Sequence, residues 1–540
     1  MKLGEAIVQK LKVSGVDTVF GIPGGGTSSD LLCNMDEMGL DFILTQHETT
    51  AAIMASIVGE IKGVPGITVA DLGPGALSLG PGMAYALLDR APLITLTDRY
   101  GTEDVDYALR QKINHNDAFK PITKLSSTLS ATNWNSMINR GFKVATTPNY
   151  GPVHFDVPND IVKQEVEDEI QVAPINTYQL SADENSIKEA VTEIEKAKYP
   201  VIIAGLAINH GSGEQFELLE NLVSKWNIPI FKTAKAKGAV SDGHEMSLGL
   251  FMGGKLEASI FEKCDLIVAI GLDPVELLPK KWSYSQKIVS LNAAPNIEEM
   301  YYADVDVVGN IKKSLKAINY LMKEGNSHWK VNDVIQHRRE VYEKLSYEAD
   351  GLTANRVVEI SQEVLPLDTL MTTDVGASKL IVTQLWNAMN PRSFFLSNGL
   401  ATMGFALPSA MALKHLFPHK TVASLTGDGG FMMRLPDIAT AVQNKWPVIN
   451  IVFSDQKLSL MDVKQKSKGY SKTAGTGFVA PNYVKFAESF SANGWIASTE
   501  EELRSALKEA LASNNQMPCI IEAKINASSY HKQFNVIRDL

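Results

Sequence analysis

Short apolar runs alternate with stretches of helical periodicity along the whole chain. From Met1 to about Asp160 five such runs read as strands, with helical patterns between them. Alternation of this kind predicts a parallel sheet whose strands are joined by crossover helices. The strands expected in this part are residues 17–23, 41–46, 66–71, 92–98 and 151–157.

The pattern begins again twice further along the chain. A second α/β part follows a polar, acidic stretch at residues 164–186, and a third follows a charged segment at residues 323–350. The expected strands are residues 199–205, 228–233, 265–271 and 287–293 in the second part, and 368–376, 393–399, 421–430, 448–455 and 519–525 in the third.

We therefore predict an α/β protein of three domains, each with a mainly parallel, doubly wound sheet. A chain of 540 residues exceeds what one hydrophobic core usually organises, so its length also indicates several domains. The boundaries expected from the polar stretches are residues 1–165, 186–325 and 351–540.

Composition and charge exclude several classes of protein. Hydrophobic residues make up 45% of the chain and charged residues 21%, as in an ordinary globular protein. The net charge is −10 and no block of Lys or Arg stands out, so nucleic acid is not an expected partner. No window approaches ~18 apolar residues in a row, so no membrane-spanning helix is expected.

The N-terminal residues and the cysteines indicate in which cellular compartment the protein is expected. Residues 1–15 carry charges throughout and lack the apolar stretch and cleavage site of a signal peptide. Cys33, Cys264 and Cys519 lie far apart with no CxxC pair, which argues against a disulfide framework and a thiolate metal site. We expect a cytoplasmic protein.

The clearest chemical signal is the turn Gly427-Asp428-Gly429-Gly430. An apolar run leads into it, and glycines at such a strand-to-helix turn let backbone N–H groups approach an anion such as phosphate. A second apolar run ends at Asp455, which places another oxygen at the same edge of the sheet. Two hard oxygen ligands beside a diphosphate suit Mg²⁺. Taken alone, however, the turn is better explained as an ordinary tight turn.

The segment around this turn resembles the cofactor motif of thiamine-diphosphate-dependent enzymes. The 27 positions from Asp428 to Asp455 match the family's spacing, although Ser454-Asp455 stands where Asn-Asn is usual. Further segments resemble the family in the family's order, namely FGIPGGGTSSDLL, LTQHETTAAIMA, GPGALSLGPGMAYALLDRAPLITLTD and GLATMGFALPSA. The relatives implied are acetolactate synthases, benzoylformate-type decarboxylases, benzaldehyde lyase and pyruvate oxidase.

The resemblance implies a fold, two cofactors and a binding site. The fold is the thiamine-diphosphate-binding fold twice, flanking a Rossmann-like middle domain, and the cofactors are thiamine diphosphate and Mg²⁺. Met403 resembles the apolar residue that bends the cofactor, and Ala401 the residue whose carbonyl meets the ring amine. The metal-site residues implied are Asp428, Asp455 and Lys457, and the cofactor-binding residues are Gly376, Ala377, Ser378, Ala401, Met403, Gly427, Asp428, Gly429, Gly430, Phe431, Asp455 and Leu458.

Glu48 is the central catalytic residue that the resemblance implies. It matches the glutamate that hydrogen-bonds the aminopyrimidine ring of the cofactor and so promotes proton removal from the thiazolium carbon. A carboxyl group in an apolar pocket has a raised pKa, which suits a group that shares a proton. A lone glutamate at a helix start is otherwise explained by the helix dipole.

Other residues near the expected substrate are less specific. Gln111 resembles a family glutamine, whereas His47 is equally explained as a structural hydrogen-bonding group, and His115 is a weaker candidate still. The glycine-rich turn at residues 21–26 lacks the GxGxxG spacing of a dinucleotide site. In the family this turn faces the active site of the neighbouring subunit, so a homodimer or homotetramer is implied.

Three departures from the family limit what is implied. Residues 271–282 lack the flavin-contacting segment of acetohydroxyacid synthases, so FAD is not expected. Arg110 stands where an aromatic residue is usual, and Lys464 where biosynthetic synthases carry a tryptophan. These two side chains suit a substrate with an additional anionic group, or else they simply face solvent.

The function expected is carbon–carbon bond formation or cleavage on a 2-oxo acid, by decarboxylation or acyloin-type carboligation. The alternative is a lyase or hydrolase that cleaves an acyloin or a diketone, because the same chemistry runs in both directions. A cofactor-binding relative without turnover is the third hypothesis. It is disfavoured because Glu48 and the glycine turn at Asp428 are both intact.

Overall fold

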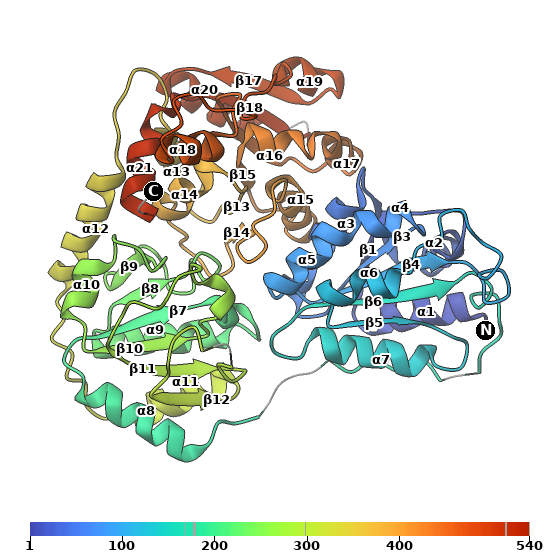
Figure 1. Ribbon diagram of the computed structural model, residues 1–540, viewed down its shortest axis with the longest axis horizontal. Coiled ribbons are helices and arrows are strands. Elements are labelled where there is room, and N and C mark those ends of the chain that lie inside the picture. Colours follow the sequence, from blue (N-terminus) through green and yellow to red (C-terminus); the bar gives the residue numbers. More distant parts are fainter. Residues whose placement is uncertain (168, 176–179, 298, 514–515, 539–540) are drawn as a thin grey trace.

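The computed structural model places the chain in three α/β units (Figure 1). Each unit is built on a six-stranded sheet in which all neighbouring strands run parallel. The predicted α/β fold class is therefore confirmed. The domain boundaries remain predictions, and residues 168 and 176–179 of the expected first linker lie outside the described part of the chain. The structure describes residues 1–167, 169–175, 180–297, 299–513 and 516–538.

The first unit contains the N-terminal sheet and its crossover helices. Its strands are β1 (Thr18–Ile22), β2 (Asp41–Leu44), β3 (Gly66–Ala70), β4 (Leu93–Arg99), β5 (Leu125–Thr128) and β6 (Pro152–Pro158). Its helices are α1 (Leu3–Val13), α2 (Thr27–Met38), α3 (Glu48–Lys62), α4 (Pro74–Ser78), α5 (Gly80–Leu88), α6 (His115–Phe119) and α7 (Trp134–Ala145).

The middle unit follows, and a helix connects it to the third. Its strands are β7 (Pro200–Ala204), β8 (Ile230–Lys232), β9 (Ser247–Leu250), β10 (Leu266–Ile270), β11 (Lys287–Asn292) and β12 (Val305–Val308). Its helices are α8 (Glu184–Lys196), α9 (Glu214–Trp226), α10 (Ala258–Lys263) and α11 (Ile311–Leu321), and the connecting helix is α12 (Val331–Leu345).

The third unit carries the glycine turn predicted from the sequence. Its strands are β13 (Leu370–Thr373), β14 (Phe394–Leu396), β15 (Val422–Gly427), β16 (Ile449–Ser454), β17 (Asn493–Ala497) and β18 (Cys519–Lys524). Its helices are α13 (Ala354–Val364), α14 (Ala377–Leu385), α15 (Ala406–Leu416), α16 (Asp428–Met432), α17 (Ile438–Gln443), α18 (Ser459–Ser467), α19 (Tyr483–Ser489), α20 (Glu500–Ala512) and α21 (Tyr530–Arg538).

The strand orders relate the first and third units and set the middle one apart. The first sheet has the order β2-β1-β3-β4-β6-β5 and the third β14-β13-β15-β16-β18-β17, which is the same order when each unit is numbered from its own first strand. The middle sheet, β12-β11-β10-β7-β8-β9, has the classic Rossmann order read from the other edge. The same fold thus occurs twice around a Rossmann-like unit.

A shared hydrophobic core joins the first and third units. Successive residues of a strand point to opposite faces, and in β1 Val19 packs with the outer helices α1 and α2 while Phe20 packs with α3. On this inner side α3 lies between α5 and α15 of the third unit, and buried residues of both units form one cluster. Figure 1 shows α3 and α15 side by side between the two sheets.

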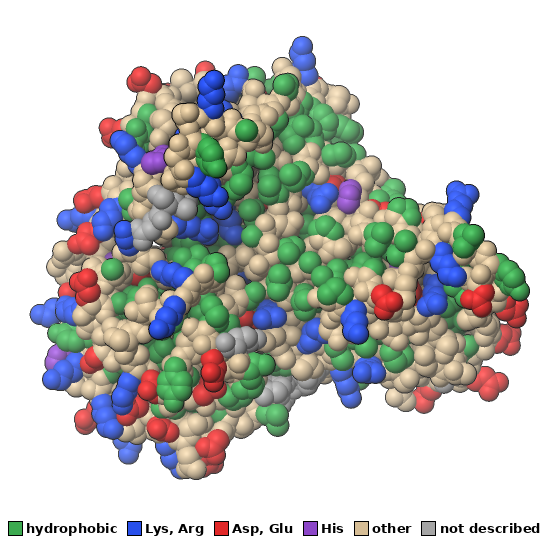
Figure 2. Space-filling model, in the orientation of Figure 1, with side chains coloured by type: hydrophobic (Ala, Val, Ile, Leu, Met, Phe, Trp, Pro, Cys, Tyr) green, Lys and Arg blue, Asp and Glu red, His purple; other side chains and the backbone are tan. Residues whose placement is uncertain are grey.

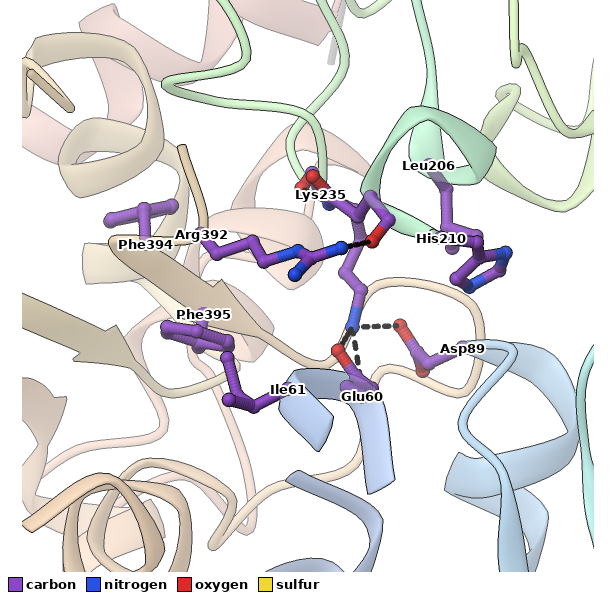
Figure 3. Close-up of a pocket in the computed structure, with 10 residues that line it drawn as sticks. Glu60, Ile61, Asp89, Leu206, His210, Lys235, Arg392, Phe394 and Phe395 are labelled. Atoms are coloured by element: carbon purple, nitrogen blue, oxygen red, sulfur yellow. Dashed lines mark hydrogen bonds and ion pairs between the residues drawn. The ribbon is translucent and has the colours of Figure 1, made fainter. Parts of the chain in front are cut away.

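A buried ionic cluster lies where the three units meet (Figure 3). The ammonium group of Lys235, in the middle unit, lies 3.1 and 3.2 Å from the two carboxylate oxygens of Glu60 and 4.0 Å from Asp89. Tyr85 lies 3.1 Å from the same ammonium group. One cation from the middle unit therefore compensates two carboxylates of the first unit in a place from which water is largely excluded.

Two surface properties bear on possible environments. Among the described helices, none combines the length and the apolar character that a membrane crossing requires. Figure 2 shows hydrophobic side chains gathered on the visible face over the third unit and along its border with the first. Large apolar side chains that are exposed include Leu77, Tyr107 and Leu109 in the first unit, and Met433 and Val479 in the third.

Replacing Lys235 by Met should destabilise the protein by about 3–5 kcal/mol, because two buried carboxylates lose their compensating cation. The control is Lys62→Met, which breaks an exposed pair with Asp17 and should cost about 0–1 kcal/mol. Denaturant unfolding of both variants measures the difference. Equal losses in the two variants would show that the cluster does not hold the units together.

Candidate active site

A cavity of about 240 Å³ lies at the carboxyl edge of the third sheet. Its walls come from the β15–α16 turn, the start of α14, the loop before α15, the β16–α18 loop and the first residue of α21. Ligands of open parallel sheets bind at this edge, where strands end and helices begin. The cavity is therefore the place where the glycine turn could act on a ligand.

The structure brings almost all of the predicted cofactor residues to this one cavity. The exception is Phe431, which is buried behind the turn and packs against the ring of Tyr483. The predicted residues that line the cavity are Gly376, Ala377, Ser378, Ala401, Met403, Gly427, Asp428, Gly429, Gly430, Asp455, Lys457 and Leu458.

Asp428 is buried at the start of α16 and organises the turn. Its carboxylate accepts backbone N–H bonds from Gly429 at 2.8 Å, Asp455 at 3.1 Å and Gln456 at 2.7 Å. The end of β15 is thereby tied to the end of β16. Burial and then the negative charge of Asp455 raise the pKa of Asp428 to about 6.

Asp455 is the second carboxylate of the cavity. One of its oxygens accepts the N–H of Lys457 at 3.2 Å, and the other accepts the hydroxyl of Ser459. Burial raises the pKa of Asp455 as well. The substitution of this residue for the usual family amide therefore puts a second anion into a partly buried place.

The residues present fit a magnesium ion and a diphosphate. A buried carboxylate whose pKa is raised by burial and by the charge of a second, half-buried carboxylate is an environment that a hard divalent cation stabilises. Lys457 can contribute only its backbone carbonyl, because an ammonium group has no acceptor. The first N–H groups of the nine-residue helix α14, at Ala377 and Ser378, have no partner within the helix, and they face the cavity at its positive end.

Two residues of the cavity region hold a left-handed backbone without being glycine. Ala401 has a φ of 54° and Gln456, between the predicted metal-site residues, a φ of 56°. Such conformations cost free energy and cluster at ligand sites, where the surrounding structure fixes them. Their presence here supports an ordered, ligand-binding role for both loops.

Two buried carboxylates, Asp374 and Asp89, hold the loop containing Ala401. Asp374 accepts N–H bonds from Gly404 at 2.9 Å and Phe405 at 3.4 Å, and burial raises its pKa to about 6. Asp89, from the first unit, accepts N–H bonds from Asn398 at 2.8 Å and Leu400 at 3.2 Å.

Met403 lies within this loop and points to the glycine turn. A Cβ atom built on Gly429 would lie 3.5 Å from its terminal carbon. Tyr530, a buried residue at the start of α21, also lines the cavity and was not predicted to do so.

Glu48 is the first residue of α3, at the carboxyl edge of the first sheet. Burial raises the pKa of its carboxyl group, and the nearby carboxylate of Asp71 adds to the effect. His47 caps the same helix, because its Nδ1 accepts the N–H of Thr49 at 3.1 Å. Glu48, His47 and Gln111 are not among the residues that line the cavity within one described chain.

The remaining candidates occupy different environments. Gln111 is exposed and has a φ of 56°, whereas His115 is buried. Arg110 is exposed, and Lys464 is half-buried on α18. Neither cation lines the cavity in the described chain, so the suggested contact with an anionic substrate remains a prediction.

The chain matches three profiles of one enzyme family. They are the thiamine pyrophosphate enzyme N-terminal TPP binding domain over residues 1–120, the central domain over 187–318 and the C-terminal TPP binding domain over 374–523.

Individual proteins are similar over nearly the whole chain. A probable acetolactate synthase large subunit of Methanococcus aeolicus is 30% identical over 98% of this chain and 93% of its own length. The acetolactate synthase of Bacillus subtilis is 27% identical, with 97% and 93% covered. A catabolic acetolactate synthase of Raoultella terrigena is 26% identical, with 94% and 92% covered.

Replacing Asp428 by Ala should weaken binding of thiamine diphosphate with Mg²⁺ by about 100-fold or more, because the diphosphate charge loses its compensation. Asp455→Asn should stay within about tenfold of the parent, because the amide retains an oxygen ligand. Isothermal titration with and without a chelator measures both. Asp368→Ala, which removes an exposed carboxylate of the same unit, is the control. Normal cofactor affinity in Asp428→Ala would contradict the metal assignment.

Proposed function

We propose that this chain, which belongs to the thiamine pyrophosphate enzyme family, forms or breaks a carbon–carbon bond next to the carbonyl of a 2-oxo acid. Decarboxylation and acyloin-type carboligation, as in the acetolactate synthases that it resembles, are the reactions favoured. Mg²⁺ is the proposed ion. No flavin is expected, and a cytoplasmic location is proposed for a chain whose described cysteines are all free.

The observation that carries this proposal is the gathering of the predicted cofactor residues around one cavity. Residues from five separate segments of the third unit line it, and they include both polar and apolar groups. The carboxylates and helix-start N–H groups suit an ion and a diphosphate, whereas Met403 and Leu458 provide apolar contacts for a ring. Thiamine diphosphate, when bound, would supply an acidic thiazolium carbon, nucleophilic once it has lost its proton, and a cationic ring that takes up the electron pair released on carbon–carbon cleavage.

The residues of the chain have distinct tasks in this proposal. Asp428 and Asp455 hold the ion, and the first N–H groups of α14 hold phosphate oxygens. Glu48 holds a proton at its carboxyl group and shares it with the aminopyrimidine ring, a task that suits its raised pKa. The carbonyl of Ala401 accepts a hydrogen bond from the ring amine.

The alternatives are less well supported. Cleavage of an acyloin or diketone uses the same bonds in reverse, but the similar proteins named above are synthases. Binding of the cofactor without turnover would not require a carboxyl group such as that of Glu48, which is half-buried at the start of α3. Product analysis with a panel of 2-oxo acids and acyloins separates the two directions.

Self-association is part of the proposal. All residues that line the cavity in the described chain belong to the third unit, which supports the proposal that Glu48 acts on a cofactor held by another subunit. Tyr107 and Leu109, which precede Gln111, are 89% and 92% exposed, and such apolar side chains suit burial in an interface. We propose a homodimer or a homotetramer with closed symmetry.

Replacing Glu48 by Gln should slow turnover roughly 100- to 10,000-fold, because the shared proton is lost while the size of the side chain is kept. Hydrogen–deuterium exchange at the thiazolium carbon should slow in parallel, and the cofactor should still bind. Glu37→Gln, an exposed residue on α2, is the control. Unchanged exchange in Glu48→Gln would reduce Glu48 to a helix-start residue.

Mixing two inactive variants tests the shared site. A heterodimer of Glu48→Gln and Asp428→Ala subunits has one site with both changes and one with neither. Random reassembly should therefore restore about one quarter of the parent activity. Activity that stays at zero after reassembly, with heterodimers shown by native mass spectrometry, would contradict a site built from two subunits.

A further inference from the structure

The backbone beside Glu48 is held by a buried histidine that the proposed mechanism does not use. The N–H of Gly73, in the loop between β3 and α4, donates to Nε2 of His115 at 3.1 Å. Gly73 has a φ of 68°, which a residue with a side chain rarely adopts. One hydrogen bond thus fixes a loop whose conformation only glycine readily provides.

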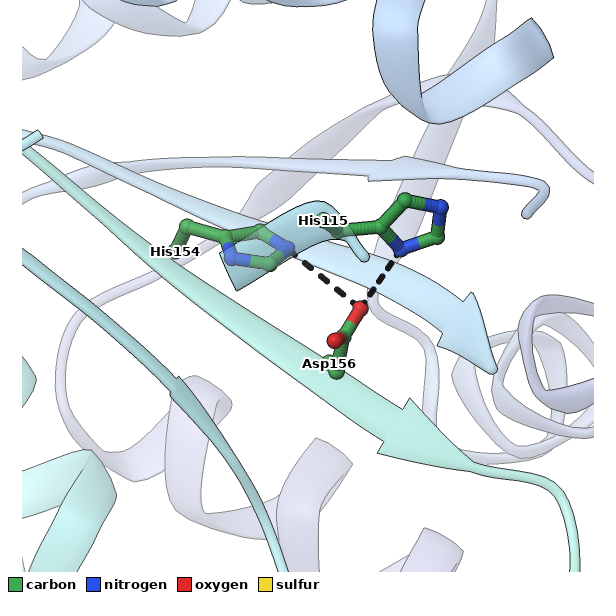
Figure 4. Close-up of side chains that lie close together, drawn as sticks. All are labelled: His115, His154 and Asp156. Carbon is green, nitrogen blue, oxygen red and sulfur yellow. Dashed lines mark hydrogen bonds and ion pairs between the residues drawn. The ribbon is translucent and has the colours of Figure 1, made fainter. Parts of the chain in front are cut away.

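His115 is itself held by a carboxylate (Figure 4). Its Nδ1 lies 2.7 Å from Oδ1 of Asp156 on β6, and both side chains are only 3% exposed. The N–H of Gly73 can only donate, so Nε2 of His115 must be the acceptor. Nδ1 must then carry the proton and donate a hydrogen bond to Asp156. Asp156 therefore selects the tautomer that can hold Gly73.

His154 completes the buried polar cluster, and its geometry has two interpretations. His115, His154 and Asp156 offer atoms close enough together to hold a metal ion. Each ring nitrogen, however, already has a protein partner, since those of His154 lie 2.7 Å from the hydroxyl of Thr97 and 2.8 Å from that of Ser126. The cluster is satisfied as a hydrogen-bond network, and we interpret it as one.

The loop at Gly73 touches two residues assigned to the active site. A Cβ atom built on Gly73 would lie 2.8 Å from the backbone oxygen of Gln111, and one built on Gly75 would lie 3.3 Å from Oε1 of Glu48. Gln111 has the left-handed φ of 56°, so its position also depends on its neighbours. A displacement of Gly73 would therefore first shift the backbone of Gln111.

We propose that Asp156 and His115 form a positioning pair that holds Gly73 and, through it, sets Gln111 at the substrate. This proposal rests on the proposed function only for the role of Gln111. His115 is hydrogen-bonded to Gly73 and Asp156 and not to Glu48, and it does not line the cofactor cavity in the described chain, so it is a positioning residue.

Two substitutions of His115 separate its hydrogen bond to Asp156 from its hydrogen bond to Gly73. The amide group of Asn lies as many bonds from Cβ as Nδ1, so His115→Asn can keep the bond to Asp156 but leaves Gly73 without an acceptor. Gln reaches as far as Nε2, so His115→Gln can accept from Gly73 but loses the bond to Asp156. Both variants remove the imidazole ring, which makes each the control for the other.

Backbone amide exchange of the protein without cofactor, followed by mass spectrometry on peptides covering residues 72–79, reads the hydrogen bond directly. Exchange should accelerate in His115→Asn and stay near the parent rate in His115→Gln. Accelerated exchange in both variants, or in neither, would overturn the proposed bond from Gly73.

The kinetic test uses a 2-oxo acid that the parent enzyme turns over. His115→Asn should lower kcat/KM about tenfold, the usual effect of one lost ordering hydrogen bond, and His115→Gln should recover most of it. Gln111→Ala should cause a similar loss, and adding His115→Asn to it should cause no further loss. Independent, additive losses would overturn positioning through Gln111.

Exchange at the thiazolium carbon keeps this result apart from the proposed function. It should be equally fast in the parent and in His115→Asn, because Glu48 is unchanged. If the parent shows no exchange, the proposed function fails, and the backbone exchange still decides the role of His115. If His115→Asn slows thiazolium exchange as strongly as Glu48→Gln does, the pair acts on Glu48 and the assignment to Gln111 is wrong.

Discussion

The packing of α3 against α15 is the constraint on which the site depends. The two helices belong to different units, yet their buried side chains form one core. Glu48 begins α3, and the loop with Ala401 and Met403 leads directly into α15. One apolar contact therefore fixes the starting points of two functional segments. Asp437 of the third unit also orients the start of α3. Its carboxylate accepts the N–H of Gln46 at 2.9 Å and the hydroxyl of Thr50 at 2.6 Å.

Buried carboxylates are the second recurring device in this protein. Asp428, Asp374, Asp89 and Asp437 each accept N–H bonds from backbone that has no partner of its own in a strand or helix. A carboxylate has several acceptor positions, so one side chain can hold consecutive residues of a loop. Burying the charge costs free energy, as the raised pKa of about 6 at Asp428, Asp374 and Asp437 reflects. In return, each loop is held by hydrogen bonds that are shielded from competing water.

The sequence predicted most of the fold because central parallel strands are buried on both faces and appear as continuous apolar runs. The strands that it missed, β5, β9, β12 and β17, all lie at sheet edges, where one side meets solvent and the apolar run is short. The site residues were likewise predictable only where a local sequence pattern marks them. Local motifs identified the cavity, whereas Asp89 and Tyr530 act across long distances in sequence and had no local signal.

The replacement of an amide by Asp455 changes the charge balance of the site. Two carboxylates would face a diphosphate that is itself anionic, and the pKa of Asp428 is raised by burial and then by the negative charge of Asp455. The cation of Lys457 lies close enough to counteract the effect of burial on Asp455, but its side chain is exposed and therefore screened. Most of the compensation must then come from the metal ion. Ion and diphosphate should consequently enter this site together, since either one alone leaves charge uncompensated in a partly buried cavity.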